Sequence, residues 1–111
     1  MDRIERYRDI VSRIIKEYAS YKPSHGEVET EAVIDREHDH YEVMHVGWHG
    51  ARRVHGCVVH IDIKHGKIWL QYDGTSQPVA DELIAAGVPK EDIVLAFHPA
   101  DVRPLTGFAV D

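Results

Sequence analysis

Residues 54–72, VHGCVVHIDIKHGKIWLQY, have the pattern of two strands joined by a tight turn, and they predict the centre of the fold. Apolar and polar side chains alternate on both sides of His65-Gly66, and a strand places alternate side chains on opposite faces. A two-residue hairpin loop needs positive φ at both positions, which Gly66 adopts without strain and His65 tolerates. The side chains expected on one face are those of Val59, Ile61, Ile63, Ile68, Leu70 and Tyr72, and those expected on the other are His60, Asp62, Lys67, Trp69 and Gln71.

Two further strands are expected before this hairpin. Residues 27–36 alternate apolar side chains with Glu27, Glu29 and Glu31, which predicts an edge strand with one acidic face. A second strand is expected over residues 41–48, but its pattern leaves two orientations open. The alternatives for its inward side chains are Tyr41, Val43 and His45, or Met44, Val46 and Trp48, of which the second set is the more apolar.

Helices are expected before and after the four strands. Apolar residues recur at spacings of three and four over residues 3–19, which predicts an amphipathic helix with Asp2 as its cap. A second helix is expected over residues 78–86, because Pro78 is favoured at a helix start. Thr75 or Ser76 is expected to cap this second helix.

The remaining segments complete the expected architecture. A turn is expected at residues 21–26, and residues 93–110 are expected at a sheet edge or against a second subunit. The chain is therefore predicted to form one domain, residues 1–111, of the α+β class. It has an N-terminal helix, a four-stranded antiparallel meander sheet covered on one face by helices, and a C-terminal helix and irregular tail.

Composition limits the classes of function. The 111 residues are 43% hydrophobic and 29% charged, which is typical of a soluble folded protein. The single cysteine, Cys57, cannot form an intrachain disulfide, and its apolar strand favours a core thiol over a catalytic one. Because no apolar run has the length of a membrane span, we expect a cytoplasmic protein without membrane contact. The formal net charge of −6 disfavours binding dominated by DNA phosphates.

Nine histidines are the least usual feature of the composition. His45 and His49, His60 and Asp62, and residues 38–40 place imidazoles and carboxylates where they could meet across neighbouring strands and bind zinc or a non-haem metal. The same pattern is also typical of exposed strand and loop positions, and no compact metal-binding motif is present. We therefore expect no metal site, no cofactor and no catalytic residue.

Two groups of polar residues are candidates for contact with a protein partner or a nucleic acid. Arg52 and Arg53 lie between the second and third strands. His98, Asp101 and Arg103 lie in an irregular segment interrupted by prolines, where polar side chains serve either as structural clamps or as contact points. The aromatic side chains that could join the two arginines in a stacking platform, or pack across the strands instead, are Trp48, Trp69 and Tyr72.

Four segments between residues 7 and 110 carry a family resemblance. They are YRDIVSRIIKEYASYKP (7–23), DREHDHYEVMHVGW (35–48), GCVVHIDIKHGKIWLQYDGT (56–75) and GVPKEDIVLAFHPADVRPLTGFAV (87–110). The last is the most specific, since GVPKEDIVLAFH is followed by Arg103, Thr106 and the run Phe108-Ala109-Val110. With these segments the chain resembles the XisI family, the fdxN element excision controlling factors of heterocyst-forming photosynthetic bacteria.

The resemblance implies a non-enzymatic accessory protein for a programmed DNA rearrangement during heterocyst differentiation. It implies an XisH-like protein as partner. It also implies a separate recombinase that cuts and joins the DNA, and this recombinase is a second candidate partner. Small size and exposed strand edges favour a homodimer. The alternatives are direct DNA binding through Arg52, Arg53 and Arg103, and a metal-dependent enzyme built on the histidines.

Overall fold

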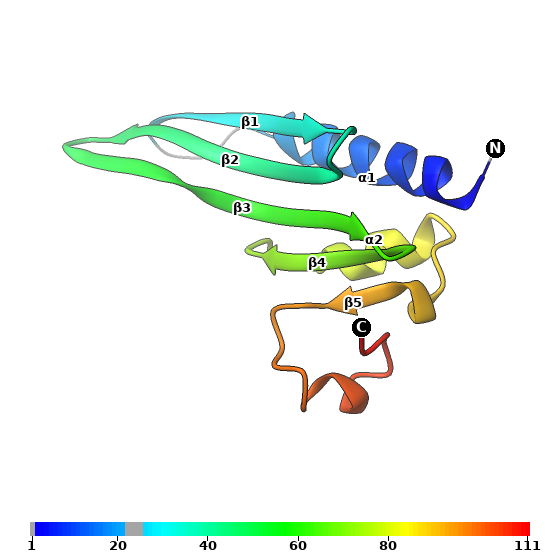
Figure 1. Ribbon diagram of the computed structural model, residues 1–111. Coiled ribbons are helices and arrows are strands. Elements are labelled where there is room, and N and C mark those ends of the chain that lie inside the picture. Colours follow the sequence, from blue (N-terminus) through cyan, green and yellow to red (C-terminus); the bar gives the residue numbers. More distant parts are fainter. Residues whose placement is uncertain (1, 22–25) are drawn as a thin grey trace.

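The computed structural model describes residues 2–21 and 26–111. The expected turn at residues 21–26 lies largely outside these residues. Both α-helices lie on the same face of a single sheet, with strand order β1-β2-β3-β4-β5 (Figure 1). The elements in chain order are α1 (Arg3–Ala19), β1 (Glu27–Asp35), β2 (His40–His49), β3 (Arg52–Lys64), β4 (Lys67–Asp73), α2 (Val79–Ala85), the 3-10 turn η1 (Lys90–Asp92), β5 (Ile93–Leu95) and the 3-10 turn η2 (Arg103–Leu105).

The sheet contains a fifth strand that the sequence pattern did not predict. β1 to β4 form the expected antiparallel meander, but β5 pairs with β4 in parallel, with Ile68 opposite Ile93 and Leu70 opposite Leu95. The intervening segment with α2 supplies the long crossover that a parallel pair requires. The expectation of a purely antiparallel, four-stranded sheet was therefore wrong, whereas the placement of part of residues 93–110 at a sheet edge is confirmed.

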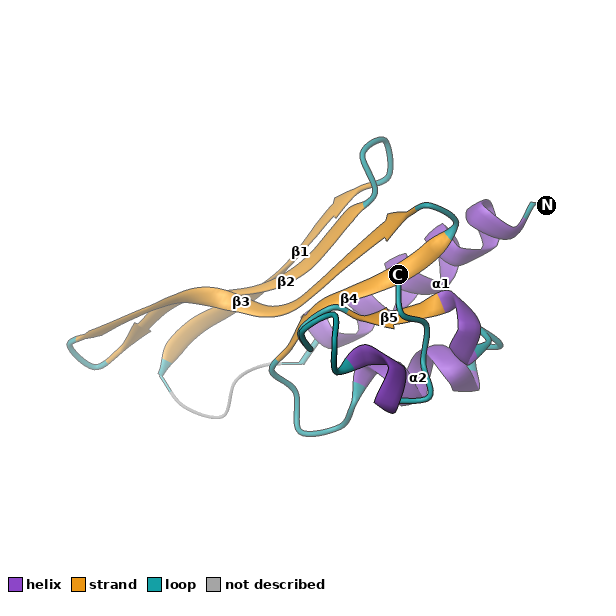
Figure 2. Cartoon of the chain, turned by 60° about the horizontal axis from the view of Figure 1, so that its bottom comes forward, coloured by secondary structure: helices purple, strands orange, loops and turns teal. Residues whose placement is uncertain are grey.

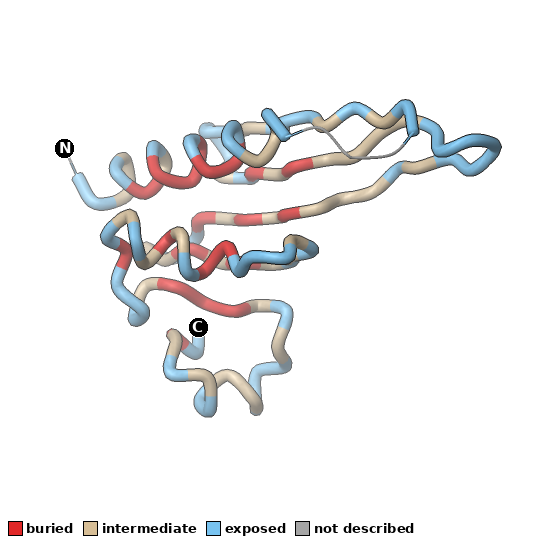
Figure 3. The backbone as a smooth tube through the Cα atoms, turned by 180° about the vertical axis from the view of Figure 1, so that it is seen from behind, coloured by how far each residue is buried: buried red, intermediate tan, exposed pale blue. Residues whose placement is uncertain are grey.

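Figure 2 shows both helices against one face of the sheet, and the core residues come from the helices and from the strands that they cover. α1 begins and ends as predicted, and the Asp2 carboxylate accepts a hydrogen bond of 2.8 Å from the Glu5 backbone N–H. Seen from behind, the buried residues follow the sides of α1 and α2 that meet the strands (Figure 3). The largest fully buried side chains are Tyr7, Val11, Ile15, Tyr41, Val43, Val59, Ile61, Ile68, Leu70, Val79, Leu83 and Ile93.

β2 turns its less apolar set of side chains toward the core. Tyr41 and Val43 are 0% and 1% exposed, whereas Trp48 is 49% exposed. The reason is register, because β3 places Ile61 opposite Tyr41 and Val59 opposite Val43 on the covered face. The alternative inward set that this pairing excludes is Met44, Val46 and Trp48.

The central hairpin has the predicted turn, with φ values of 53° at His65 and 77° at Gly66. Ile68 and Leu70 are buried as predicted, but Tyr72 is 50% exposed. Between His60 and Ile61 the register with β4 shifts by one residue. Such a bulge changes the face on which the following side chains lie, and Tyr72 therefore leaves the core.

The start of α2 differs from the prediction. Neither Thr75 nor Ser76 caps the helix, and the Val79 backbone N–H instead donates a hydrogen bond of 2.8 Å to the Asp73 carboxylate. Asp73 also accepts hydrogen bonds from the backbone N–H and the hydroxyl of Thr75. The carboxylate at the end of β4 thus fixes the path of the chain into α2.

One end of the sheet extends beyond both helices (Figure 1). We call this end the arm, and it consists of residues 27–32, 44–49 and 52–57 of β1, β2 and β3. None of the arm residues, all of which the structure describes, is buried. The arm therefore has no fully buried side chain, and its residues are exposed or half-buried.

Candidate functional site

The face of the sheet opposite the helices, here called the open face, gathers polar side chains where β2, β3 and β4 lie side by side. Strand alternation places His60 and Asp62 there because Val59 and Ile61 fill the covered face. The side chains of this polar group are those of His40, Glu42, His60, Asp62 and Gln71.

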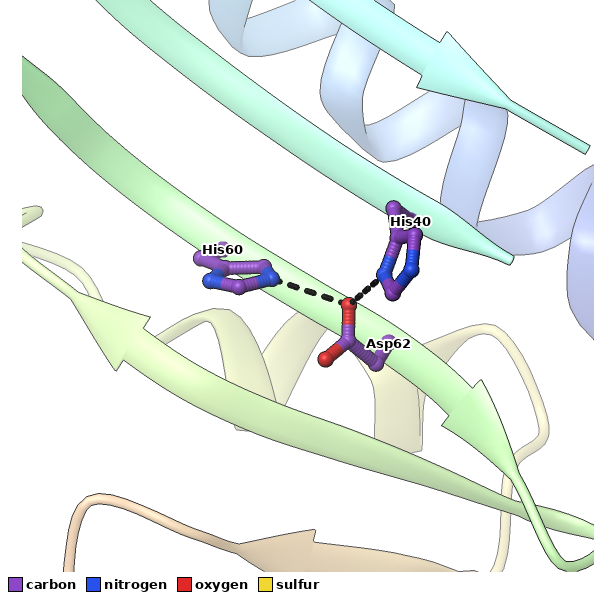
Figure 4. Close-up of side chains that lie close together, drawn as sticks. All are labelled: His40, His60 and Asp62. Atoms are coloured by element: carbon purple, nitrogen blue, oxygen red, sulfur yellow. Dashed lines mark hydrogen bonds and ion pairs between the residues drawn. The ribbon is translucent and has the colours of Figure 1, made fainter. Parts of the chain in front are cut away.

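Asp62 lies between His40 and His60 (Figure 4). Its Oδ1 atom is 2.8 Å from His40 Nδ1 and 2.9 Å from His60 Nε2, and its Oδ2 accepts a hydrogen bond of 3.2 Å from Gln71 Nε2. An ionised carboxylate can only accept hydrogen bonds, so both imidazoles present an N–H to the same oxygen. The Asp62 side chain is 14% exposed, whereas that of His40 is 58% exposed.

The register between β2 and β3 builds the group. His40 lies directly opposite Asp62, and Glu42 lies directly opposite His60. Directly opposed residues of an antiparallel pair have Cβ atoms about 4.5–5.5 Å apart, which is close enough for these side chains to meet. Glu42 Oε1 is 3.8 Å from His60 Nε2, so a second carboxylate borders the cluster.

The cluster changes the protonation of its members. The hydrogen bond to Asp62, and then the charge of that carboxylate, raise the pKa of His40. Burial alone would raise the pKa of Asp62, but the hydrogen bonds from His40 and His60 outweigh burial and lower it. Asp62 is therefore ionised at neutral pH, and His40 holds a proton more readily than a free imidazole does.

His40, His60 and Asp62 each offer one metal-ligating atom, and these three atoms lie within 4.8 Å of one another. Among residues 2–21 and 26–111, no other group of three His, Cys, Asp or Glu side chains has this property. His38, which the sequence grouped with His40, instead contacts Asp35 at 2.8 Å. Glu42 and Gln71 were missed, because only the pairing register and the β4 bulge reveal that they approach the cluster.

Arg52 and Arg53 lie at the tip of the arm, where β3 begins. The Arg53 guanidinium lies 5.3 Å from the centre of the Trp48 ring, and its Nη1 donates to the Gly47 carbonyl at 3.4 Å. The C-terminal segment lies well away from this tip, beyond β5, in both views (Figures 1 and 2). The two arginines therefore do not form one patch with Arg103.

Arg103 acts as a clamp for the C-terminal segment. Its guanidinium donates hydrogen bonds to the carbonyl oxygens of His98 at 3.0 Å, Val110 at 3.4 Å and Ala96 at 3.5 Å. His98 is half-buried beside the Phe97 ring, and Asp101 is exposed. These three hydrogen bonds give Arg103 a structural role within the C-terminal segment.

Trp69 forms a second group on the open face. Lys64 Nζ lies 4.0 Å and Arg103 Cζ 5.6 Å from the centre of its ring. Trp69 lines a groove of about 540 Å³ together with Lys64, His65, Lys67 and Asp111. Because Trp48 lies on the arm and contacts Arg53, the two tryptophans do not form the shared stacking platform considered above.

Cys57 is half-buried in β3, as a structural thiol would be. Its S–H donates a hydrogen bond of 3.2 Å to the Val59 carbonyl. Burial raises the pKa of the thiol, and the charge of Glu42 raises it further. A raised pKa disfavours the thiolate, which is the nucleophilic form.

Comparisons with known proteins agree over the whole chain. The family model described as XisI protein matches residues 1–110. The structure resembles the crystal structure of a XisI-like protein from Anabaena variabilis ATCC 29413, with 42% identity, a TM-score of 0.92 and coverage of 97% of this chain and 99% of that one. It also resembles the fdxN element excision controlling factor XisI from the same organism, with 36% identity, a TM-score of 0.86 and coverage of 99% and 100%.

A search of curated proteins found no match. Neither helix in the described part of the chain is long and apolar enough to cross a membrane.

Proposed function

The chain belongs to the XisI family, and from that premise we propose that it is a cytoplasmic accessory factor that controls the excision of a DNA element without catalysing it. The observation that carries this proposal is the full-length similarity to the protein described as fdxN element excision controlling factor XisI, which covers 99% of this chain and 100% of that one. Similarity over the whole length, rather than over one motif, favours a shared role.

The environments of two potentially nucleophilic groups support a non-enzymatic role. The Cys57 thiol has a raised pKa, which disfavours its nucleophilic form. Tyr7 donates its hydroxyl to Asp92, and burial followed by that hydrogen bond raises its pKa to about 12. A nucleophile must reach its ionised form, which both raised pKa values disfavour.

The proposed partner is an XisH-like protein, and the proposed setting is the DNA rearrangement of heterocyst differentiation. In this arrangement a separate recombinase breaks and joins the DNA strands. The present chain contributes a binding surface that controls that reaction.

We assign the partner contact to the arm. A sheet with accessible apolar side chains gains stability when another element covers it. Trp48 is 49% exposed at the arm and lies beside Arg53. Tryptophan and arginine are enriched among the side chains that contribute most to protein–protein binding.

The test is co-expression with the XisH-like protein, followed by pull-down and light scattering of the complex. We expect Trp48→Ser and Arg53→Glu each to weaken the complex by at least about 10-fold. Arg13→Glu is the matched control, because it makes the same charge reversal at an exposed position of α1.

Two outcomes would contradict the proposal in different ways. Absence of any complex with a well-folded protein would reject the XisH-like partner. A complex that tolerates both arm variants but not Arg13→Glu would reject the arm as the contact surface and favour the helical side.

A homodimer is part of the proposal and is tested by light scattering of the protein alone. The chain has a mass of 12.7 kDa, so a dimer and a monomer are readily distinguished. We expect a dimer at tens of micromolar, and a monomer at that concentration would reject it.

Direct DNA contact is the second candidate function, and the cations around Trp69 favour it. An aromatic ring flanked by Lys64 and Arg103 is the kind of element that stacks against a base in single-strand binders. Binding of this kind weakens as salt rises, because the cations displace condensed counterions. A salt-dependent affinity that Lys64→Gln lowers would support this function, and absent or salt-insensitive binding would reject it.

A further inference from the structure

The His40–Asp62–His60 cluster has the donor set of a transition-metal site. Two imidazole nitrogens and one carboxylate oxygen come from β2 and β3, and the antiparallel pairing of these strands fixes their positions. Imidazole nitrogen suits zinc and similar ions, whereas magnesium and calcium prefer sites made only of oxygen. We propose that His40, His60 and Asp62 form a binding site for one zinc-class divalent cation on the open face of the sheet.

The spacing of the ligand atoms fits such an ion after a small side-chain adjustment. Zinc–nitrogen and zinc–oxygen distances of about 2.0–2.2 Å place tetrahedral ligand atoms roughly 3.3–3.6 Å apart. In the cluster, the two nitrogen–oxygen distances are 2.8 and 2.9 Å, and all three atoms lie within 4.8 Å of one another. Rotation of the exposed His40 ring widens its contact with Asp62, and a small rotation of the His60 ring, which is 31% exposed, widens the other.

The protonation of the cluster is compatible with metal binding. Asp62 is already ionised, and a neutral imidazole needs only to carry its proton on the nitrogen that faces away from the ion. For His40 that nitrogen belongs to a side chain that is 58% exposed, so water can accept its hydrogen bond.

The surroundings orient the carboxylate and balance the charge. Gln71 holds Asp62 Oδ2, and outer contacts of this kind orient metal ligands in proteins. Glu42 adds a second negative charge 3.8 Å from His60 Nε2. The nearest cation along β3, Lys64, is held over the Trp69 ring.

A bound ion would join β2 to β3 on the face that has no helical cover. Because the ion binds the folded cluster, it should raise the unfolding temperature in proportion to its occupancy. The site contains no arm residue, so the metal site and the proposed partner contact are tested separately.

The test is calorimetric titration of the metal-free protein with Zn²⁺, together with the absorption spectrum of the Co²⁺ complex. We expect one equivalent with a Kd of about 1 µM or lower. Asp62→Asn should weaken binding by more than the roughly 10–100-fold that loss of an outer contact causes. His55→Gln is the matched control, since it removes an exposed histidine from the same strand and should leave the affinity unchanged.

His40→Gln provides a second variant in case Asp62→Asn disturbs folding, because the His40 side chain is largely exposed. We expect it to abolish both the Co²⁺ spectrum and the zinc-dependent rise in unfolding temperature. Several weak, equivalent sites that His55→Gln reduces as much as His40→Gln does would overturn the proposal. Failure of the unsubstituted protein to bind Zn²⁺ would overturn it as well.

Discussion

The covered face and the open face of the sheet are made by the same strands, yet they differ in burial and in polarity. On β3, Ile61 is 0% exposed among apolar side chains, while the next residue, Asp62, holds two imidazoles on the other side. The covered face supplies stability through burial, and the open face supplies groups that can be titrated or bound. Because neighbouring side chains of a strand lie on opposite faces, a shift of one residue in register would exchange the buried and the polar side chains.

The largest expected effect is on the covered face. Ile61→Ala removes a fully buried side chain and should lower the free energy of unfolding by about 2–5 kcal/mol, through lost burial and the cavity left behind. His60→Gln changes the adjacent residue on the open face and should lower it by less than about 1 kcal/mol. Urea denaturation measures both, and similar losses for the two variants would break the distinction between the faces.

The attachment of α2 to the covered face should have an intermediate effect. Asp73→Ala removes the carboxylate that accepts from the Val79 N–H, and a lost helix cap costs about 0.5–2 kcal/mol. Ser76→Ala should be nearly neutral, because the Val79 N–H at the start of the helix donates to Asp73 and not to Ser76. Urea denaturation of both variants checks this assignment, and a larger loss for Ser76→Ala would contradict it.

The arm should contribute little to stability. Trp48→Ser removes a half-exposed ring and its contact with Arg53, and exposed cation–π contacts contribute only about 0.5–1 kcal/mol. The midpoint of urea denaturation should therefore move slightly, while partner binding weakens by at least about 10-fold. A loss as large as that of Ile61→Ala would show that the arm has a packed core.

The smallest effect on stability should come from the titration of the open-face cluster. Because folding raises the pKa of His40, its contribution is complete below its unfolded pKa of about 6.5 and is lost as pH rises through the folded value. Folding lowers the pKa of Asp62, so the contribution of that carboxyl is present above about pH 4 and is lost as pH falls through the folded value. NMR titration of the His40 ring should give a pKa that falls in Asp62→Asn, and an unchanged pKa would contradict the cluster.

Much of the fold followed from local patterns. Alternation over residues 54–72 assigned Val59, Ile61 and Asp62 to the correct faces, and the spacing of apolar residues gave α1 its full length. β5 was missed because three apolar residues, Ile93–Leu95, are too few to show a strand period. β4, with which it pairs in parallel, is distant in sequence, and local sequence patterns do not indicate such a pairing.

The site was only partly accessible to sequence reasoning. The shared face of His60 and Asp62 was evident, but selecting His40 from the histidines of the preceding segment required the β2–β3 register. The register places His40 opposite Asp62, but it shifts between Val43 and Met44. The histidines of the arm therefore pair with β3 in a different alignment. Bulges depend on tertiary packing rather than on composition, and single-sequence patterns do not locate them.

The two edges of the sheet limit how many chains can join by strand pairing. At one edge, the Ala109 N–H donates to the Ile93 carbonyl at 2.9 Å, and Ala109 bridges Val94, so the outer side of β5 is already occupied. At the other edge, β1 carries Glu27, Glu29 and Glu31. Two chains that joined through β1 would expose only occupied β5 edges, so strand addition would end at a pair and could not propagate into a fibre.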